Sequence, residues 1–340
     1  MVTKLRNPLD NVPKLDYSQI MGGEMQAEIL SALREFAFFY IVDIPGFEAE
    51  TEMEVMREFF RLPLSAKERY GTVKHNPNNT NVLRGYGNTK NALGLPIEEV
   101  YNIGQFGSRD IGVSDVSCRA EFISREANMW PRDGDFPGSQ RFRCVLANSF
   151  KTRIDLARNI VDSISAELDY PEFSSKFQKA EFTSLYLKKY STRDGKDNVH
   201  IYKADSGYSM KTEGGLDLSV PAHVDTTVTL LATYRNGGLQ AVYRGAWYDV
   251  PSVMGSLMMM SGNLIEDLTD GKLPALQHRV LDIKEERYST PFFFNPSFEA
   301  DISRTQSGKE TGKGFSQFGP WQVIQLHRDE PLLLNNNSLN

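Results

Sequence analysis

In Val220-Pro221-Ala222-His223-Val224-Asp225-Thr226 a histidine and an aspartate stand two positions apart, and Gln277-His278-Arg279-Val280 supplies a second histidine further along the chain. Residues i and i+2 of a β-strand share one face, so His223 and Asp225 can point the same way while His278 arrives from a later strand. The sequence therefore predicts one metal ion held by His223, Asp225 and His278.

Two imidazoles and one carboxylate on one side of an ion leave the opposite positions open, which is the arrangement of non-haem Fe(II) oxygenases. The same donors can hold a catalytic zinc ion, and a jelly roll that binds a ligand without transforming it is a third interpretation. A zinc hydrolase gives no role to Arg287 and Ser289, which follow the third metal ligand. We therefore favour an oxygenase whose open positions take O2 and an organic co-substrate.

The sequence between the two histidines predicts β-structure. It contains short runs of strand-forming residues separated by Gly, Asn and Pro, at 229–231, 237–240, 247–251 and 256–260. We expect a mainly β fold with flanking helices (α+β), built on a double-stranded β-helix of the jelly-roll or cupin type. Apolar residues recur every three or four positions from Phe142 to Leu168 and predict a long supporting helix outside the barrel. Shorter helices are expected at 25–36 and 51–60.

Length and composition predict one core with an extension, since the 340 residues are 40% hydrophobic and 24% charged. We expect an N-terminal α/β region at 1–130 and the supporting helix within 131–180. The catalytic core is expected at 181–300 with an insertion at 191–220, followed by a C-terminal segment and tail at 301–340.

The formal net charge of −6 and the lack of a Lys/Arg run favour a small-molecule substrate over nucleic acid. No apolar N-terminal segment or membrane-length apolar stretch is seen, so we expect a cytoplasmic protein that does not enter a membrane. Cys118 and Cys144 are expected to be reduced and structural.

Residues 191–221 are rich in Gly, Asp, Ser and Lys and form a long connection before the His-x-Asp motif. Long connections are commonly lids or disordered segments. An active-site flap that presents His200, Tyr202 or Lys203 therefore stands beside a solvated insertion as an interpretation. The segment 315–325, with Trp321, is a candidate to close over the barrel mouth. Three histidines without a partner at ligand spacing are expected to be surface or hydrogen-bonded residues: His75, His200 and His327.

Several segments in fixed order resemble the 2-oxoglutarate and Fe(II)-dependent dioxygenase superfamily, specifically the branch with isopenicillin N synthase and the soluble plant and fungal oxygenases. These segments are Ala32–Tyr40, Phe59-Phe60-Arg61-Leu62-Pro63 with Lys67, Arg84-Gly85-Tyr86-Gly87, Glu99–Gly104 and Trp130-Pro131. The resemblance covers most of the chain. It implies Fe(II), 2-oxoglutarate as co-substrate, O2, and a monomer.

Arg287 predicts carboxylate recognition, because a guanidinium can clamp a carboxylate with two parallel hydrogen bonds. Ser289, on the same strand face, can donate a third, and Tyr190, which matches the family's tyrosine in the neighbouring strand, a fourth. The resemblance implies that this set holds the distal carboxylate of 2-oxoglutarate. Isopenicillin N synthase uses the equivalent site for a carboxylate of its substrate instead, and the spacing from His278 to Arg287 looks closer to that enzyme. Both owners of the site stay open, with 2-oxoglutarate favoured.

Residues 182–190 predict a strand with Ser184, Tyr186, Lys188 and Tyr190 on one face, which suggests a wet interior. Five residues are candidates for substrate contact on the pocket wall: Arg84, Tyr86, Tyr101, Tyr186 and Lys188. Their cationic and phenolic groups suit a carboxylate-bearing, amino-acid-derived metabolite. Hydroxylation, desaturation and oxidative cyclisation, including kainoid-type ring closure, all stay open. The chain departs from common family members at Lys188 and at Asn263.

Overall fold

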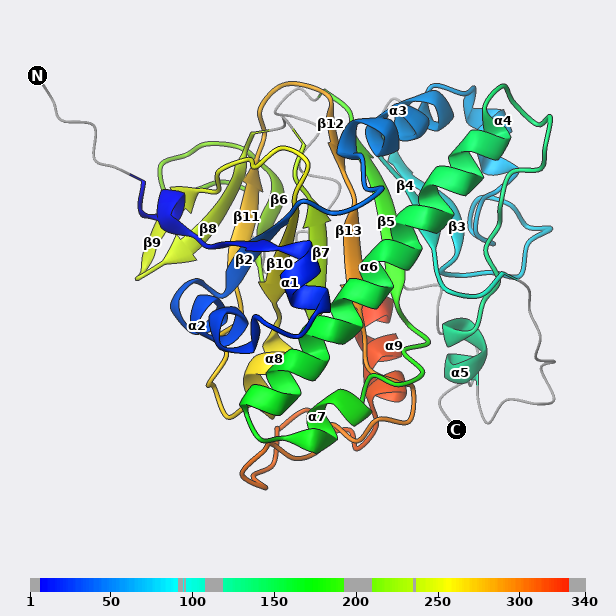
Figure 1. Ribbon diagram of the computed structural model, residues 1–340. Coiled ribbons are helices and arrows are strands. Elements are labelled where there is room, and N and C mark those ends of the chain that lie inside the picture. The colour runs from blue at the N-terminus through cyan, green and yellow to red at the C-terminus, as the bar shows by residue number, and fades with distance from the viewer. Residues whose placement is uncertain are drawn as a thin grey trace, which may run out of the picture.

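The computed structural model describes residues 7–90, 94, 96–107, 119–192, 210–234 and 237–329. Two β-sheets face each other, and helices cover the outer face of the larger one (Figure 1). Between the sheets lies a small apolar core that contains Leu231, Ala241 and Met258. The predicted double-stranded β-helix with flanking helices is confirmed.

The larger sheet has the order β1-β2-β10-β7-β13-β5-β4-β3, and β12 also pairs with β5. Its strands are β1 (Lys14–Asp16), β2 (Phe38–Val42), β3 (Gly85–Lys90), β4 (Pro96–Ile103), β5 (Ser184–Tyr190), β7 (Val228–Ala232), β10 (Leu257–Ser261), β12 (Arg287–Ser289) and β13 (Pro291–Phe294). The smaller sheet has the order β6 (Leu218–His223), β11 (His278–Leu281), β8 (Leu239–Tyr243) and β9 (Ala246–Asp249). All pairings are antiparallel except that of β1 with β2.

The helices are α1 (Tyr17–Met21), α2 (Gln26–Phe36), α3 (Ala49–Phe60), α4 (Leu64–Glu68), α5 (Arg119–Ser124), α6 (Ser139–Glu167), α7 (Pro171–Ser175), α8 (Asn263–Leu268) and α9 (Phe318–Asp329), with a 3-10 turn η1 at Pro8–Asn11. The long predicted helix is confirmed as α6, which crosses the larger sheet in Figure 1. Its apolar stripe packs on the sheet, where the ring of Phe150 lies 5.2 Å from that of Phe292. The predicted helices at 25–36 and 51–60 are confirmed as α2 and α3.

The two faces of β5 have different environments. Leu185 and Leu187 belong to the core beneath α6, so the alternating residues Tyr186, Lys188 and Tyr190 point the other way, into the barrel. The ring of Tyr186 stacks edge-on against Phe293 of β13 at 5.5 Å. We call this side the inner face of the sheet. Tyr186 and Lys188 are only partly buried there, whereas Ser184 and Tyr190 are buried, so two of the four residues agree with the predicted wet interior.

Other sequence predictions have mixed outcomes. The proposed flap residues His200, Tyr202 and Lys203 lie outside the described residues, as does Cys118, and β6 already begins at Leu218, within the predicted insertion. Cys144 is free as predicted, but it is exposed on α6 and so does not pack in the core. The imidazole of His75 accepts a hydrogen bond from the Asn88 backbone at 3.2 Å, as expected for a hydrogen-bonded histidine. The domain limits stay predictions.

The C-terminal helix α9 packs beside α5, and Trp321 is buried against Phe318 with ring centroids 5.8 Å apart. Closure of the barrel mouth by this segment stays a prediction, and the His327 side chain and the tail lie outside the described part of the chain. None of the described helices is long and apolar enough to cross a membrane.

Candidate metal centre and co-substrate site

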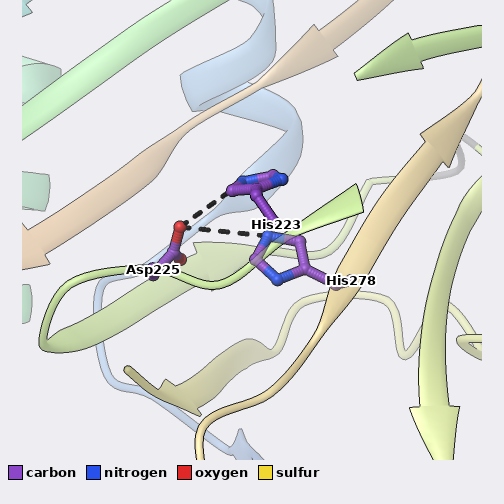
Figure 2. A group of neighbouring side chains, drawn as sticks. All are labelled: His223, Asp225 and His278. Carbon is purple, nitrogen blue, oxygen red and sulfur yellow. Dashed lines mark ion pairs between the residues drawn. The ribbon is translucent and has the colours of Figure 1, made fainter. Parts of the chain in front are cut away.

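His223, Asp225 and His278 converge where the smaller sheet meets the larger one. β6 ends at His223 and β11 begins at His278, and the two histidines are direct partners across these antiparallel strands. Asp225 lies beyond the end of β6, in the loop before β7. The expectation that His223 and Asp225 share a strand face is therefore wrong, since the loop, and not strand alternation, turns the carboxylate toward the imidazoles (Figure 2).

The three side chains form a compact donor set. One ligand atom from each lies within 4.8 Å of the others, and the Oδ1 atom of Asp225 is 3.6 Å from Nε2 of His223 and 3.9 Å from Nε2 of His278. The imidazole centroids are 4.2 Å apart. Two nitrogens and one oxygen on one side of a point fit Fe(II) with open positions opposite them.

Hydrogen bonds around the donors fix which atoms are available to a metal. Nδ1 of His223 lies 2.8 Å from the Pro221 carbonyl, and Nδ1 of His278 lies 3.1 Å from the Leu276 carbonyl. Because a carbonyl can only accept, each ring carries its proton on Nδ1 and leaves the Nε2 lone pair for the ion. Thr229 donates to Oδ2 of Asp225 at 2.6 Å, which leaves Oδ1 facing the two imidazoles. In the sequence alone, Thr229 is recognisable only as a strand former.

The electrostatics of the centre also favour a neutral donor. Burial and the neighbouring His278, with a smaller contribution from Lys188, lower the pKa of His223 to about 4, although Asp225 acts in the opposite direction. The imidazole is therefore unprotonated near neutral pH. A metal needs the neutral form of this side chain, so the ligand is ready without first losing a proton.

Gly262 allows the loop that carries Asp225 to lie directly against the start of α8. A Cβ atom on Gly262 would lie 2.5 Å from Thr226 C and 2.6 Å from the Asp225 carbonyl oxygen. Next to it, the Asn263 backbone donates to that carbonyl at 2.9 Å. Asn263, one of the two positions where the sequence departs from common family members, thus makes this contact through its main chain. Its side-chain Oδ1 atom is buried without a hydrogen-bond partner in the described part of the chain.

Arg287 and Ser289 lie on the inner face of β12, opposite Tyr190 and Lys188 of β5. Arg287 is 6% exposed, and its guanidinium lies over the Tyr190 ring, 5.7 Å from the centroid. A cavity of about 30 Å³ is lined by Arg287, Ser289 and Leu231 among others. The hydroxyl of Tyr190 as a further donor stays a prediction.

No carboxylate pairs with Arg287 within the residues that the structure describes, and its Nε has no hydrogen-bond partner there. Burial lowers the pKa of Arg287, because removing the cation from water disfavours its charged form. A buried cation is costly unless an anion accompanies it. The arrangement is therefore suited to binding a carboxylate ligand.

Two of the five predicted substrate residues, Tyr186 and Lys188, face the barrel interior. Tyr86 and Tyr101 do not, because Tyr86 pairs with Tyr101 and Tyr101 with Leu187, which places all three on the core side. The Tyr101 ring packs 4.9 Å from Phe59, and its hydroxyl donates to the Met129 carbonyl at 2.5 Å. The Tyr86 hydroxyl donates to Glu99 at 2.7 Å. The structure does not bring these two tyrosines to the site.

Arg84 is fully buried at the end of the sheet, and protein groups occupy its guanidinium. It donates to Oδ1 of Asn102 at 2.7 Å and to the Thr183 carbonyl at 3.0 Å, and also to the Ser184 hydroxyl. These contacts join the loop before β3 to β4 and the start of β5. These contacts give Arg84 a structural role, and its contact with substrate stays a prediction.

The structure adds Glu98 and Phe293 to the inner face near Tyr186 and Lys188. Glu98 on β4 forms an ion pair with Lys188, with Oε1 3.4 Å from Nζ. The sequence alone gives only a weak signal that Glu98 belongs to the site, because Glu98 and Glu99 are adjacent and only strand register shows which one faces inward.

The comparisons with known proteins agree with this geometry. Residues 12–133 match the model described as non-haem dioxygenase in morphine synthesis N-terminal, and residues 197–296 match the 2OG-Fe(II) oxygenase superfamily model. The chain belongs to the 2OG-Fe(II) oxygenase superfamily. It is thus an oxidoreductase of the Fe(II)- and 2-oxoglutarate-dependent oxygenase class, with a small molecule as substrate.

Curated relatives cover most of the chain at low identity. Isopenicillin N synthase of Streptomyces clavuligerus is 26% identical over 312 residues, covering 87% of each chain. A 2-oxoglutarate-Fe(II) type oxidoreductase of Aspergillus fumigatus is 27% identical over 305 residues, covering 84% of this chain and 83% of that one. Among solved structures, a full-length Neurospora crassa protein in complex with alpha-KG and 5-formyluracil is similar with a TM-score of 0.66 and 20% identity, over 93% of this chain and 95% of that chain. The last similarity concerns the fold alone.

Proposed function

We propose that His223, Asp225 and His278 hold Fe(II), and that Arg287 and Ser289 bind the distal carboxylate of 2-oxoglutarate. The observation that carries this proposal is the buried guanidinium of Arg287, which has no carboxylate partner among the described residues and lies on the inner face of the sheet that also supports the metal centre. The substrate is a small, carboxylate-bearing, amino-acid-derived metabolite, and the enzyme acts as a monomer.

The spacing of the two sites supports this assignment. Thr229 hydrogen-bonds Asp225, and Leu231, two residues along β7, lines the cavity beside Arg287. Two residues of a β-strand span roughly 7 Å. A five-carbon dicarboxylate is suited to such a span, with one end at the metal centre and the other at the guanidinium.

When bound, Fe(II) and 2-oxoglutarate supply the oxidising power, because O2 is reduced as 2-oxoglutarate is oxidised to succinate and CO2 and one C–H bond of the substrate is oxidised. The chain's own residues orient the reactants. Thr229 holds Asp225, the Pro221 and Leu276 carbonyls hold the imidazoles, and Arg287 holds the co-substrate. The inner face of β5 presents Tyr186 and Lys188 to the substrate and thereby determines which C–H bond is attacked.

The isopenicillin N synthases among the relatives favour a second candidate, in which Arg287 binds a carboxylate of the substrate and no 2-oxoglutarate is used. Hydroxylation, desaturation and oxidative cyclisation, including kainoid-type ring closure, are the reactions open to the first candidate, whereas the second, which has no 2-oxoglutarate to oxidise, is an oxidative cyclase. The mass of the product separates hydroxylation, which adds an oxygen atom, from the other two reactions, which both remove two hydrogen atoms.

The test is anaerobic titration of the Fe(II) protein with 2-oxoglutarate, followed by the visible metal-to-ligand charge-transfer band. Loss of hydrogen bonds to a charged group costs about 1.5–3 kcal/mol, so Arg287→Ala should weaken 2-oxoglutarate binding by at least tenfold. Arg141→Ala, which removes a surface arginine paired with Glu54, is the control and should bind as wild type does. Iron binding without any band at saturating 2-oxoglutarate would reject the first candidate in favour of the second.

A further inference from the structure

One ion pair faces the barrel interior beside the candidate site. Nζ of Lys188 on β5 and Oε1 of Glu98 on β4 are 3.4 Å apart, and their side chains are 28% and 15% exposed. Lys188 lies opposite Ser289 in the strand register, and Glu98 lies opposite Tyr190, the partner of Arg287. The pair therefore lies on the inner face, beside the proposed co-substrate residues Arg287 and Ser289.

The neighbouring glutamate shows what a purely structural arrangement looks like in this sheet. Glu99 faces the core, where Lys67, Lys189 and the Tyr86 hydroxyl all bind its carboxylate, and it is almost completely buried. Glu98 has Lys188 as its partner among the described residues and keeps part of its surface open. A partly exposed, long ion pair contributes little to stability, so a ligand can replace it at small cost.

The balance of charges in the site limits which ligand can replace the ion pair between Lys188 and Glu98. Within the proposed function, the charges of Fe(II), Asp225, the 2-oxoglutarate dianion and Arg287 cancel. Among the charged side chains described on this part of the inner face, Lys188 and Glu98 then remain, and they also cancel. An anionic substrate would bind Lys188 and leave the Glu98 carboxylate unpaired in a confined space. A cationic substrate would bind Glu98 and leave the Lys188 ammonium group unpaired. A substrate with both charges satisfies both partners.

We propose that the substrate is a zwitterionic α-amino acid or a close derivative, whose carboxylate binds Lys188 and whose ammonium group binds Glu98. The edge-to-face pair of Tyr186 and Phe293 forms the apolar wall for the rest of the molecule. This inference rests on the proposed function, since it assigns the substrate of the same site. It makes Glu98 and Lys188 specificity-determining residues.

Anaerobic isothermal titration calorimetry tests the inference, with the Fe(II)·2-oxoglutarate protein titrated by the common L-amino acids. For each one that binds, the N-acetyl derivative and the amide are titrated as well, since each lacks one of the two charges. We expect at least one amino acid to bind, with blocking of either charge raising its Kd tenfold or more. Failure of every amino acid to bind, or equal binding of blocked forms, would overturn the proposal.

The variants identify the partner of each charge. Glu98→Gln should raise the Kd of the amino acid tenfold or more but should not raise the Kd of its anionic N-acetyl derivative, because no carboxylate is then left unpaired. Lys188→Met should raise the Kd of the N-acetyl derivative, and Lys188→Arg should bind this derivative more tightly than Lys188→Met does. Glu54→Gln, which breaks a surface pair with Arg141, is the matched control. Wild-type affinity in Glu98→Gln, with normal thermal unfolding, would remove Glu98 from the site.

The readouts separate the two proposals. The charge-transfer band reports 2-oxoglutarate at the iron, and the calorimetric heat reports the amino acid. If the band is absent while an amino acid still binds through Glu98, the proposed function fails and the zwitterion site stands. If the band is normal but no amino acid binds, the proposed function stands and the zwitterion site is rejected.

Discussion

Replacement of Thr229 by valine should weaken iron binding without unfolding the protein. Thr229 is fully buried and donates to Oδ2 of Asp225 at 2.6 Å. Valine has nearly the same shape, so the change removes one hydrogen bond to a charged ligand and creates no cavity. Such a bond contributes about 1.5–3 kcal/mol, and a tenfold change in affinity corresponds to about 1.4 kcal/mol. We therefore expect the Kd for Fe(II) to rise about 10–100-fold, the range that is usual when a group supporting a metal ligand is lost.

The assay is anaerobic competition for Fe(II) between the protein and a chromophoric chelator. Thr227→Val is the matched control, because Thr227 is also buried and hydrogen-bonded, but to the Phe294 carbonyl at 2.8 Å and Oδ1 of Asn295 at 2.7 Å. That variant should lose stability and keep its iron affinity. Equal iron affinity in Thr229→Val and wild type, or an equal loss in both variants, would refute the role of the Thr229 hydroxyl.

Two further predictions concern the scaffold. Gly262→Ala should lower both Tm and iron affinity, because the added Cβ would meet backbone atoms of Thr226 that cannot move without shifting Asp225. Gly271→Ala is the control, because a Cβ there meets nothing within 4 Å. It should lower Tm through the positive φ of Gly271 alone and leave iron affinity unchanged. Burial raises the pKa of Glu52, but Arg153 and three hydroxyl groups outweigh it and hold the pKa below the ordinary 4.5. The stabilisation from Glu52 is therefore present above pH 4.5 and is lost as the pH falls through the lowered value. In urea unfolding, the stability gap between wild type and Glu52→Gln should narrow below pH 4.5, and a constant gap would contradict this sign.

The fold class, the long helix and the convergence of the three candidate metal donors could be predicted because each has a local signal. The His-x-Asp spacing, the distant histidine and the helical repeat up to Leu168 are properties of short segments. The reason given for the convergence of His223 and Asp225 was nevertheless wrong, since β6 ends at His223. A sequence pattern identifies strand tendency better than the residue where a strand stops.

The substrate wall could not be predicted, because it depends on strand register and on partners far away in the chain. One residue decides whether a side chain of β4 faces the core or the site, and so Tyr101 and Glu99 point to the core while Glu98 points inward. The sequence suggests Arg84 only as a candidate for substrate contact. Its acceptors are Asn102 on β4 and the Thr183 carbonyl directly before β5, and only the folded chain brings them together.

The N-terminal region supplies none of the proposed metal or co-substrate ligands, yet it supports the strand that carries Arg287. Glu52 of α3 is completely buried and binds Arg153 of α6 through two 2.8 Å contacts. The same carboxylate accepts hydrogen bonds from Tyr234, just after β7, at 2.6 Å, and from Thr290, directly after Ser289, at 2.8 Å. One buried anion thus ties two outer helices to the ends of the strands that hold Leu231 and Ser289. Because a charge buried with this many partners is costly to displace, the co-substrate end of the barrel is held in place from outside the barrel. We therefore expect the contacts of Glu52 to restrain the strand ends beside Leu231 and Ser289, and with them the proposed co-substrate site.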